Sequence, residues 1–349
     1  MTNNKRKGIA CGGVWIVDVV KVVDCYPAEN SLANISSESF GGGGCAHNVT
    51  INLARFDQTM ELHALGVVGS DPNGDFLINQ CRQFPNINTD QIVRTNLDRT
   101  SYTDVFSIRN KGGRTFFHYR GANRLFGPKY VDLDALPVEI LHLGYLLLLD
   151  TMDQPDQYFG TTAARFLAGV RKHGIKTSID LVSEDSRRFT QIVPPALRHT
   201  DYCIINDFEA ERLSGISIRE QGKLICKNLK RIATAIFEMG VQELVVIHFP
   251  EGAYLLTKDR TEIIQPSLAL PEDFIVGSTG AGDSFCAGVL YGVHSGWNYE
   301  RTLQFAVCAG GMNLRDLTST GGIGSCKEVF AMQEKFPFRN ALDYTSAHN

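Results

Sequence analysis

The sequence predicts an α/β fold with a doubly wound, mainly parallel sheet that is flanked by helices and carries a small β lid. From about residue 140 onward, short apolar runs alternate with segments of helical length, and this alternation is typical of parallel strands covered by helices. Around residues 100–120 the pattern changes to an alternating run with a turn in it, which predicts a hairpin. We therefore expect one domain over 1–349, with the lid inserted from about 14–25 and 98–125.

Four apolar runs are the predicted buried strands of the sheet: Ile140–Leu149, Ile175–Asp180, Tyr202–Ile205 and Leu244–His248. Between them, Tyr158–Lys172 and Ile218–Met239 have the length and spacing of helices. Ligands of such sheets bind beyond the carboxyl ends of the strands. We expect the functional site at that edge.

The predicted hairpin begins with the alternating residues 102–108 and continues in Thr115–Tyr119, and Asn110–Gly113 supplies its turn. The earlier segment Val14–Val23 can pair with it. Its aromatic side chains need a cover, so the hairpin either folds over a site as a lid or packs against a second subunit. The second arrangement would give a homodimer through the lid.

Composition and charge exclude several classes of partner. There are 34 Lys and Arg against 38 Asp and Glu, a formal net charge of -4, with no run of either sign that would bind nucleic acid or a membrane surface. The apolar run Leu141–Leu149 is far shorter than the roughly 20 residues of a membrane helix. Nine scattered cysteines lack CxxC spacing, so we expect neither disulfides nor a zinc site. A small-molecule partner and a cytoplasmic location follow.

Glycine is in surplus, at 33 residues where average usage predicts roughly 24. The segment Gly277–Ser284 nearly matches the phosphate loop G-x-x-x-x-G-K-[ST], but Asp283 stands in place of the lysine. A carboxylate repels phosphate, which predicts that Asp283 contacts the group that attacks the phosphate and not the phosphate itself. At a helix start we expect it to stay ionised, with a pKa at or below about 3.9. A glycine-rich helix cap is the alternative.

Gly280–Asp283 and the helix after it resemble the C-terminal signature of the ribokinase family of carbohydrate kinases, also called the phosphofructokinase-B family. Three further segments fit the family in the same order: Phe40–Asn48 with the helix that follows it, Gly66–Gly74, and Asn206–Glu209. The match runs from about residue 8 to 330. The resemblance implies a ribokinase-like fold and ATP-dependent phosphoryl transfer to a hydroxymethyl group of a sugar or sugar acid, as in fructokinases, ketodeoxygluconate kinases and ribokinases.

The resemblance also implies roles for single residues. Asp283 would be the catalytic base, and the N–H groups of Gly280, Ala281 and Gly282 would stabilise developing charge. The implied sugar-binding residues are Asp18, Gly43, Gly44, Asn48 and Arg120. The implied nucleotide-binding residues are Asn206, Glu209, Gly252, Ser278 and Thr279, and Glu209 would also hold Mg²⁺ indirectly, through water. We expect the two glycine clusters, 41–44 and 277–282, to meet across one cleft.

Simpler structural explanations stay open for several of these residues. Asp18 can be a solvated carboxylate at the end of the first strand. Asn206 and Glu209 can form a helix cap with an acidic first turn, and Arg120 can be an ordinary surface arginine. Gly277 stands where the family often has an aspartate that helps to hold a monovalent cation, so activation by such a cation is left open.

Two other functions remain alternatives to a sugar kinase. In a nucleoside kinase, Phe106, Phe117 and Tyr119 of the hairpin could stack on a base. In a sugar-binding relative with impaired catalysis, the nucleotide contacts would be lost. That second alternative is suggested by Ile247–Gly252, which keeps only Gly252 of the pattern T-x-G-x-x-G, and by Asp180, which lacks the usual Pro-Asn after it.

Overall fold

The body of the protein is one large sheet between two layers of helices. The computed structural model describes residues 7–108, 114–184 and 186–340, so the predicted turn Asn110–Gly113 lies outside them. Within these residues the sheet strands are β1 (Ile9–Gly13), β4 (Leu62–Gly69), β5 (Ile87–Thr95), β8 (Ile140–Leu146), β11 (Lys176–Leu181), β12 (Tyr202–Asn206), β15 (Leu244–Phe249), β16 (Gly252–Thr257) and β17 (Glu262–Pro266).

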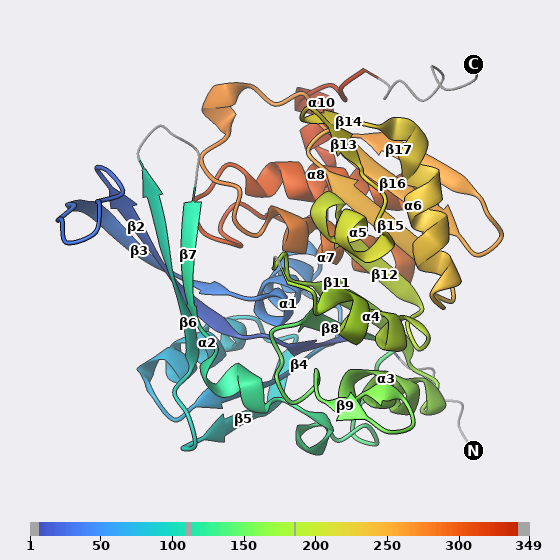
Figure 1. The fold of residues 1–349 in the computed structure, drawn as a ribbon, viewed down its shortest axis with the longest axis horizontal. Coiled ribbons are helices and arrows are strands. Elements are labelled where there is room, and N and C mark those ends of the chain that lie inside the picture. Colours follow the sequence, from blue (N-terminus) through green and yellow to red (C-terminus); the bar gives the residue numbers. More distant parts are fainter. Residues whose placement is uncertain (1–6, 109–113, 185, 341–349) are drawn as a thin grey trace.

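The order of these strands is β17-β16-β15-β12-β11-β8-β1-β4-β5 (Figure 1). The run from β15 to β5 is parallel, and β16 and β17 are antiparallel at one edge. The central strands are near-continuous apolar runs, as expected where both faces of a sheet are covered. The predicted mainly parallel, doubly wound sheet is confirmed.

Helices cover both faces of the sheet. They are α1 (Cys45–Phe56), α2 (Pro72–Arg82), α3 (Thr162–Lys172), α4 (Phe189–Leu197), α5 (Asp207–Ser214), α6 (Cys226–Glu238), α7 (Ala281–His294), α8 (Tyr299–Asn313), α9 (Cys326–Phe330) and α10 (Met332–Lys335). One hydrophobic core lies under α1, α7 and α8, and the other lies under α3, α4 and α6. In the described part of the chain, no helix combines the length and the apolar character required to cross a bilayer.

Both predicted helices begin later than their sequence spacing indicates. Gly160 has a φ of 87° and cannot be helical, so α3 starts only at Thr162, after the short strands β9 (Pro155–Asp156) and β10 (Gly160–Thr161). The first part of the predicted helix 218–239 is wrong. Gln221 and Gly222 have positive φ and form a tight turn between β13 (Arg219–Glu220) and β14 (Lys223–Leu224).

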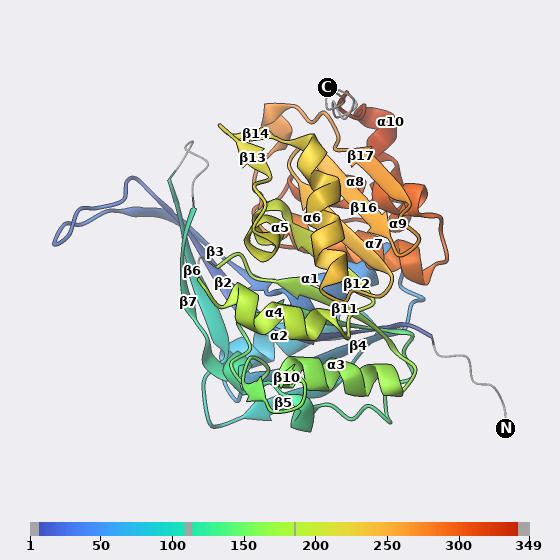
Figure 2. The same cartoon turned by 45° about the vertical axis from the view of Figure 1, so that its right-hand side comes forward.

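A second, four-stranded sheet projects from the body (Figures 1 and 2). Its strands are β2 (Ile16–Val23), β3 (Ile35–Gly43), β6 (Ser101–Ile108) and β7 (Arg114–Tyr119), in the order β3-β2-β6-β7. The predicted hairpin is the antiparallel pair β6 and β7. The predicted pairing of the earlier segment is also present, since β2 pairs with β6, in parallel. Strand β3 was not predicted, because its polar and glycine-rich sequence lacks apolar alternation.

The four-stranded sheet, which corresponds to the predicted lid and is called the lid below, is fixed to the body at Trp15, between β1 and β2. The backbone N–H of Trp15 donates to Oδ1 of Asn123, and Nδ2 of Asn123 donates to the carbonyl of Trp15, both at 3.0 Å. Nε1 of the Trp15 indole donates to the carbonyl of Leu65 at 2.8 Å. Trp15 and Asn123 are both buried, so each of these polar groups depends on its protein partner.

We predict that Asn123→Ala lowers the free energy of unfolding by about 3 kcal/mol, because it leaves two buried backbone groups of Trp15 without partners. Denaturant unfolding measures this change. The matched control is Asn96→Ala on the surface, which should change stability by no more than about 0.5 kcal/mol. Equal effects of the two substitutions would contradict the role given to Asn123.

Candidate active site

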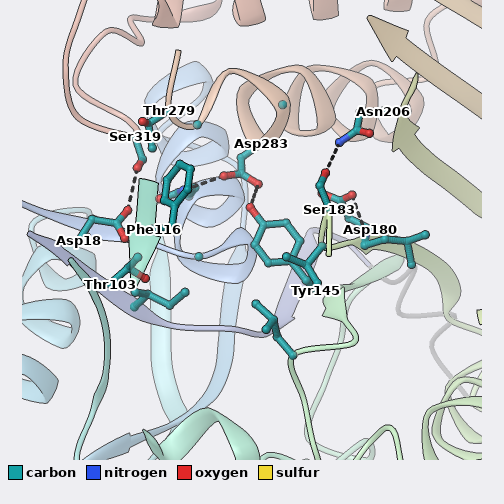
Figure 3. Close-up of a pocket in the computed structure, with 18 of the residues that line it drawn as sticks. Asp18, Thr103, Phe116, Tyr145, Asp180, Ser183, Asn206, Thr279, Asp283 and Ser319 are labelled. Carbon is teal, nitrogen blue, oxygen red and sulfur yellow. Dashed lines mark hydrogen bonds between the residues drawn. The ribbon is translucent and has the colours of Figure 1, made fainter. Parts of the chain in front are cut away.

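A cavity of about 410 Å³ lies where the lid meets the body. The body contributes the carboxyl ends of β8, β11 and β12 and the N-terminal turns of α1 and α7, and the lid contributes residues of β2, β6 and β7. The sequence-predicted residues that line it are Asp18, Gly44, Asn48, Asn206, Glu209, Thr279, Gly280, Gly282 and Asp283. Figure 3 shows Asp283 between a group formed by Asp18 and Ser319 and a group formed by Asp180, Ser183 and Asn206.

Asp283 is buried in the first turn of α7 and is held by two donors. Nδ2 of Asn48 donates to Oδ2 at 2.7 Å, and the hydroxyl of Tyr145 donates to Oδ1 at 2.8 Å. Burial raises the pKa of Asp283, although both hydrogen bonds oppose the rise. The expectation of a pKa at or below the ordinary value was therefore wrong, because desolvation of the carboxylate outweighs the favourable helix terminus.

The N-terminus of α7 separates this cavity from a second one. Gly280 caps the helix with a φ of 77°, and a Cβ there would lie 2.0 Å from the carbonyl oxygen of Ser319, so only glycine fits. The second cavity, of about 530 Å³, has a mainly apolar lining and includes the predicted residues Gly252, Ser278 and Ala281. Both cavities are lined by Asn206, His248 and Gly282.

Asn206 and Glu209 form a capping box at the start of α5, which is the helix-cap arrangement that the sequence left open. Oδ1 of Asn206 accepts from the N–H of Glu209 at 2.9 Å, and Oε2 of Glu209 accepts from the N–H of Asn206 at 3.0 Å. Oε1 of Glu209 accepts from Ser183 Oγ and Asn206 Nδ2. Both residues still line the cavity, so the cap also presents polar groups to a ligand.

Three carboxyl groups, of Asp180, Glu209 and Asp283, are buried around this cavity. Burial raises the pKa of Glu209 to about 7. Burial and the negative charges of Glu209 and Asp283 raise the pKa of Asp180 well above its ordinary value. Such a cluster of oxygen donors favours a hard cation.

Asp18 lies within β2 and not at the end of the first strand. Its Oδ2 accepts a hydrogen bond from Ser319 Oγ at 3.2 Å. Gly43 packs directly against it, since a Cβ on Gly43 would lie 2.1 Å from Oδ2. Gly43 is therefore needed to make room for the Asp18 carboxylate, whereas Gly44 reaches the cavity itself.

The structure does not bring Arg120 to the cavity lining. Its Nη1 donates to Oδ1 of Asp150 at 2.6 Å and to the carbonyl of Leu147 at 3.1 Å. Arg120 therefore pairs with Asp150 at the base of the lid, as expected of an ordinary surface arginine and not of a sugar-binding one.

Sequence reasoning missed several residues of the cavity. Tyr145 lies in the apolar strand β8, where periodicity marks it only as a core residue. Thr103, Phe116 and His118 reach the cavity from the lid. Phe106, Phe117 and Tyr119, which the sequence suggested for stacking on a base, do not line it. One signal for Tyr145 was available in the sequence. Its hydroxyl stands at the carboxyl end of a buried strand, which is where ligands of such sheets bind.

Comparisons with known proteins agree on one family. The family model described as pfkB family carbohydrate kinase matches residues 7–322. A nucleoside kinase of Methanocaldococcus jannaschii is 23% identical over 85% of this chain and 87% of its own length. A probable chloroplastic fructokinase of Arabidopsis thaliana, fructokinase-6, is 26% identical over 81% of this chain and 69% of its own length.

The fold is shared with solved structures. Ribokinase of Arabidopsis thaliana, solved in complex with ribose and ATP, superposes with a TM-score of 0.76 at 19% identity, over 93% of this chain and 98% of that one. At this identity the likeness establishes the ribokinase fold alone, and the family model supplies the assignment. The chain belongs to the pfkB family of carbohydrate kinases and is a phosphotransferase.

Proposed function

We propose that this protein transfers the γ-phosphoryl group of ATP to a hydroxymethyl group of a sugar or sugar acid. The observation that carries the proposal is the position of Asp283. This carboxylate stands at the N-terminus of α7. That terminus lines both a cavity next to the lid that contains many polar side chains, called the polar cavity below, and a more apolar cavity on the other side. The polar cavity suits a polyol, and the apolar one suits an adenine ring.

In the polar cavity, Asp18 and Asn48 would bind sugar hydroxyl groups, and Gly44 would let the backbone approach the ring. The attacking hydroxyl oxygen forms a bond to the γ-phosphorus while the bond from that phosphorus to the ADP oxygen breaks. Asp283 orients the hydroxyl and accepts its proton late in the transfer, as in other kinases. The donors Asn48 and Tyr145 fix both oxygens of the Asp283 carboxylate, so its direction toward the substrate is set beforehand.

The nucleotide would lie with its base in the apolar cavity and its phosphates at the start of α7. The N–H groups of Gly280, Ala281 and Gly282 would stabilise charge on the transferred group, each by about 3 kcal/mol. Gly252 and Ser278 line the nucleotide side, and Thr279 lines the sugar side. This arrangement holds donor and acceptor on opposite sides of one helix terminus.

The carboxylates around the cavity fit Mg²⁺. Both oxygens of Glu209 already accept hydrogen bonds from protein groups, which supports contact through water and not direct ligation, and Mg²⁺ commonly keeps several waters. When bound, Mg²⁺ would neutralise charge on the β- and γ-phosphate oxygens. Asn206 and Glu209 would orient its water shell.

The lid would close over the sugar and exclude water, which would otherwise accept the phosphoryl group. Phe116 is one of its cavity-lining residues, and an aromatic ring there also suits a nucleoside base, so a nucleoside kinase is the second candidate.

Phe40 and Phe117 are 60% exposed on the lid. These aromatic side chains support a homodimer through the lid, which light scattering of the purified protein would test.

A panel of free sugars, sugar acids and nucleosides, assayed with ATP by ADP release, tests the proposal. Turnover with a sugar or sugar acid supports it, and turnover with nucleosides alone assigns the second candidate. Sugar binding by calorimetry without ADP release from any acceptor would contradict catalysis and indicate a sugar-binding relative.

We predict that Asp283→Asn lowers kcat by about 100-fold or more, because it removes the proton acceptor while keeping the side-chain shape. Steady-state ADP release measures kcat, and calorimetry checks that sugar and ATP still bind. Asp273→Asn, at an exposed position, is the control and should leave kcat unchanged. Near-normal turnover of Asp283→Asn would overturn the assignment of the base.

We predict that Tyr145→Phe moves the acid limb of the kcat/KM profile to higher pH. The Tyr145 hydroxyl donates to Asp283 and lowers its pKa, so its removal raises that pKa further, and the base is then protonated up to a higher pH. Rates measured across the acid range for both proteins check this direction. Tyr158→Phe, at an 85% exposed position, should reproduce the parent profile; an unmoved or lowered limb in Tyr145→Phe would count against the coupling.

A further inference from the structure

Three buried side chains beside the polar cavity bring metal-ligating atoms together. Cys45 Sγ lies 3.0 Å from Nε2 of His142 and 3.6 Å from Oδ2 of Asp180, and the three ligand atoms all lie within 4.8 Å of one another. They come from the start of α1, from β8 and from β11. The spacing of cysteines along the chain gave no sign of this cluster, because its members are far apart in sequence.

These separations are close to those of donor atoms in one coordination sphere. In a tetrahedral site with zinc–sulfur bonds of about 2.3 Å and zinc–nitrogen bonds of about 2.0 Å, neighbouring donor atoms lie about 3.5 Å apart. Sγ of Cys286 lies 3.8 Å from the same Nε2 of His142, but it does not belong to the set of ligand atoms that all lie within 4.8 Å of one another. The fourth position is therefore left to water. Sulfur, imidazole and carboxylate donors in one set select zinc or a similar transition metal over Mg²⁺.

The imidazole of His142 is oriented as metal-bound histidines are. Its Nδ1 lies 3.0 Å from Ser178 Oγ, so an Nδ1–H that donates to this hydroxyl leaves the Nε2 lone pair directed at Cys45. Metal-ligating histidines commonly use their other nitrogen in this way, and that outer contact fixes both tautomer and ring angle. Ser178 and His142 are fully buried, so no water competes for this bond at the surface.

Gly144 leaves space between the donors. A Cβ at this position would lie 2.5 Å from Sγ of Cys45 and 3.3 Å from Nε2 of His142. Any larger residue would therefore fill the volume that these two donor atoms share. Asp180 lines the polar cavity, which gives an ion a route from solvent.

We propose that Cys45, His142 and Asp180, with water in the fourth position, bind one zinc-like divalent transition metal. On binding, the metal replaces the proton on the Cys45 sulfur and any proton on the Asp180 carboxyl, and these protons leave to solvent without any change of oxidation state. Cys45 also interacts with Asp283. The ion would therefore bind directly behind the proposed catalytic carboxylate.

Co²⁺ is the probe that tests this site, in protein without nucleotide or sugar. The parent protein carries Cys25→Ser, since Cys25 is exposed and could bind cobalt by itself. We expect one equivalent of Co²⁺ to give a thiolate-to-cobalt charge-transfer band and the visible bands of tetrahedral cobalt, all abolished by Zn²⁺. Cys45→Ser should lose the charge-transfer band. Cys81→Ser, at a buried cysteine of α2 outside the cluster, should keep it.

Ser178→Ala provides a variant that keeps every donor. It should weaken Co²⁺ binding by about 10- to 100-fold through loss of the outer contact to His142. Melting temperatures without metal establish that each variant folds, and if Cys45→Ser does not fold, His142→Gln and Ser178→Ala decide the result. Absence of the bands in the parent protein, or their survival in these variants at unchanged affinity, would overturn the proposal.

Discussion

A carboxylate buried in the first turn of a helix must be satisfied by its neighbours, and this requirement on Asp283 constrains the rest of the site. A buried charge without partners lowers the stability of the fold by about 3 to 5 kcal/mol. Asn48 and Tyr145 supply its donors from α1 and from β8. These two elements and α7 must therefore keep their relative positions within hydrogen-bonding distance, and the core packed beneath α1 and α7 holds them there.

The same region is electrostatically unfavourable as it stands. Glu209 and Asp283 each raise the pKa of the Asp180 carboxyl, so the three groups resist simultaneous ionisation in a poorly solvated place. Stability alone would favour apolar residues here. A cluster of this kind is expected where function selects against stability, and both cation sites proposed above would relieve the repulsion by supplying positive charge.

The sequence predicted what depends on local pattern and missed what depends on distant contacts. Apolar runs in alternation with helices are sufficient to predict the parallel sheet, and Asp283 after three glycines marks a helix terminus. Tyr145 was missed because an apolar strand hides a single functional hydroxyl. The raised pKa of Asp283 was missed because burial is set by elements that are remote in sequence. The cluster at Cys45 was missed for the same reason, since α1, β8 and β11 meet only in the folded chain.

The two glycine clusters meet through a chain of contacts that the sequence did not indicate. Gly43 leaves room for the Asp18 carboxylate, Asp18 accepts a hydrogen bond from Ser319, and the carbonyl of Ser319 packs against Gly280. The lid strand β2 is thereby joined to the loop that holds Ser319, and that loop packs against the start of α7. A sugar hydroxyl that donates to Asp18 would compete with Ser319 for that carboxylate. In the proposed function, substrate binding and the position of the lid would therefore be coupled through Oδ2 of Asp18.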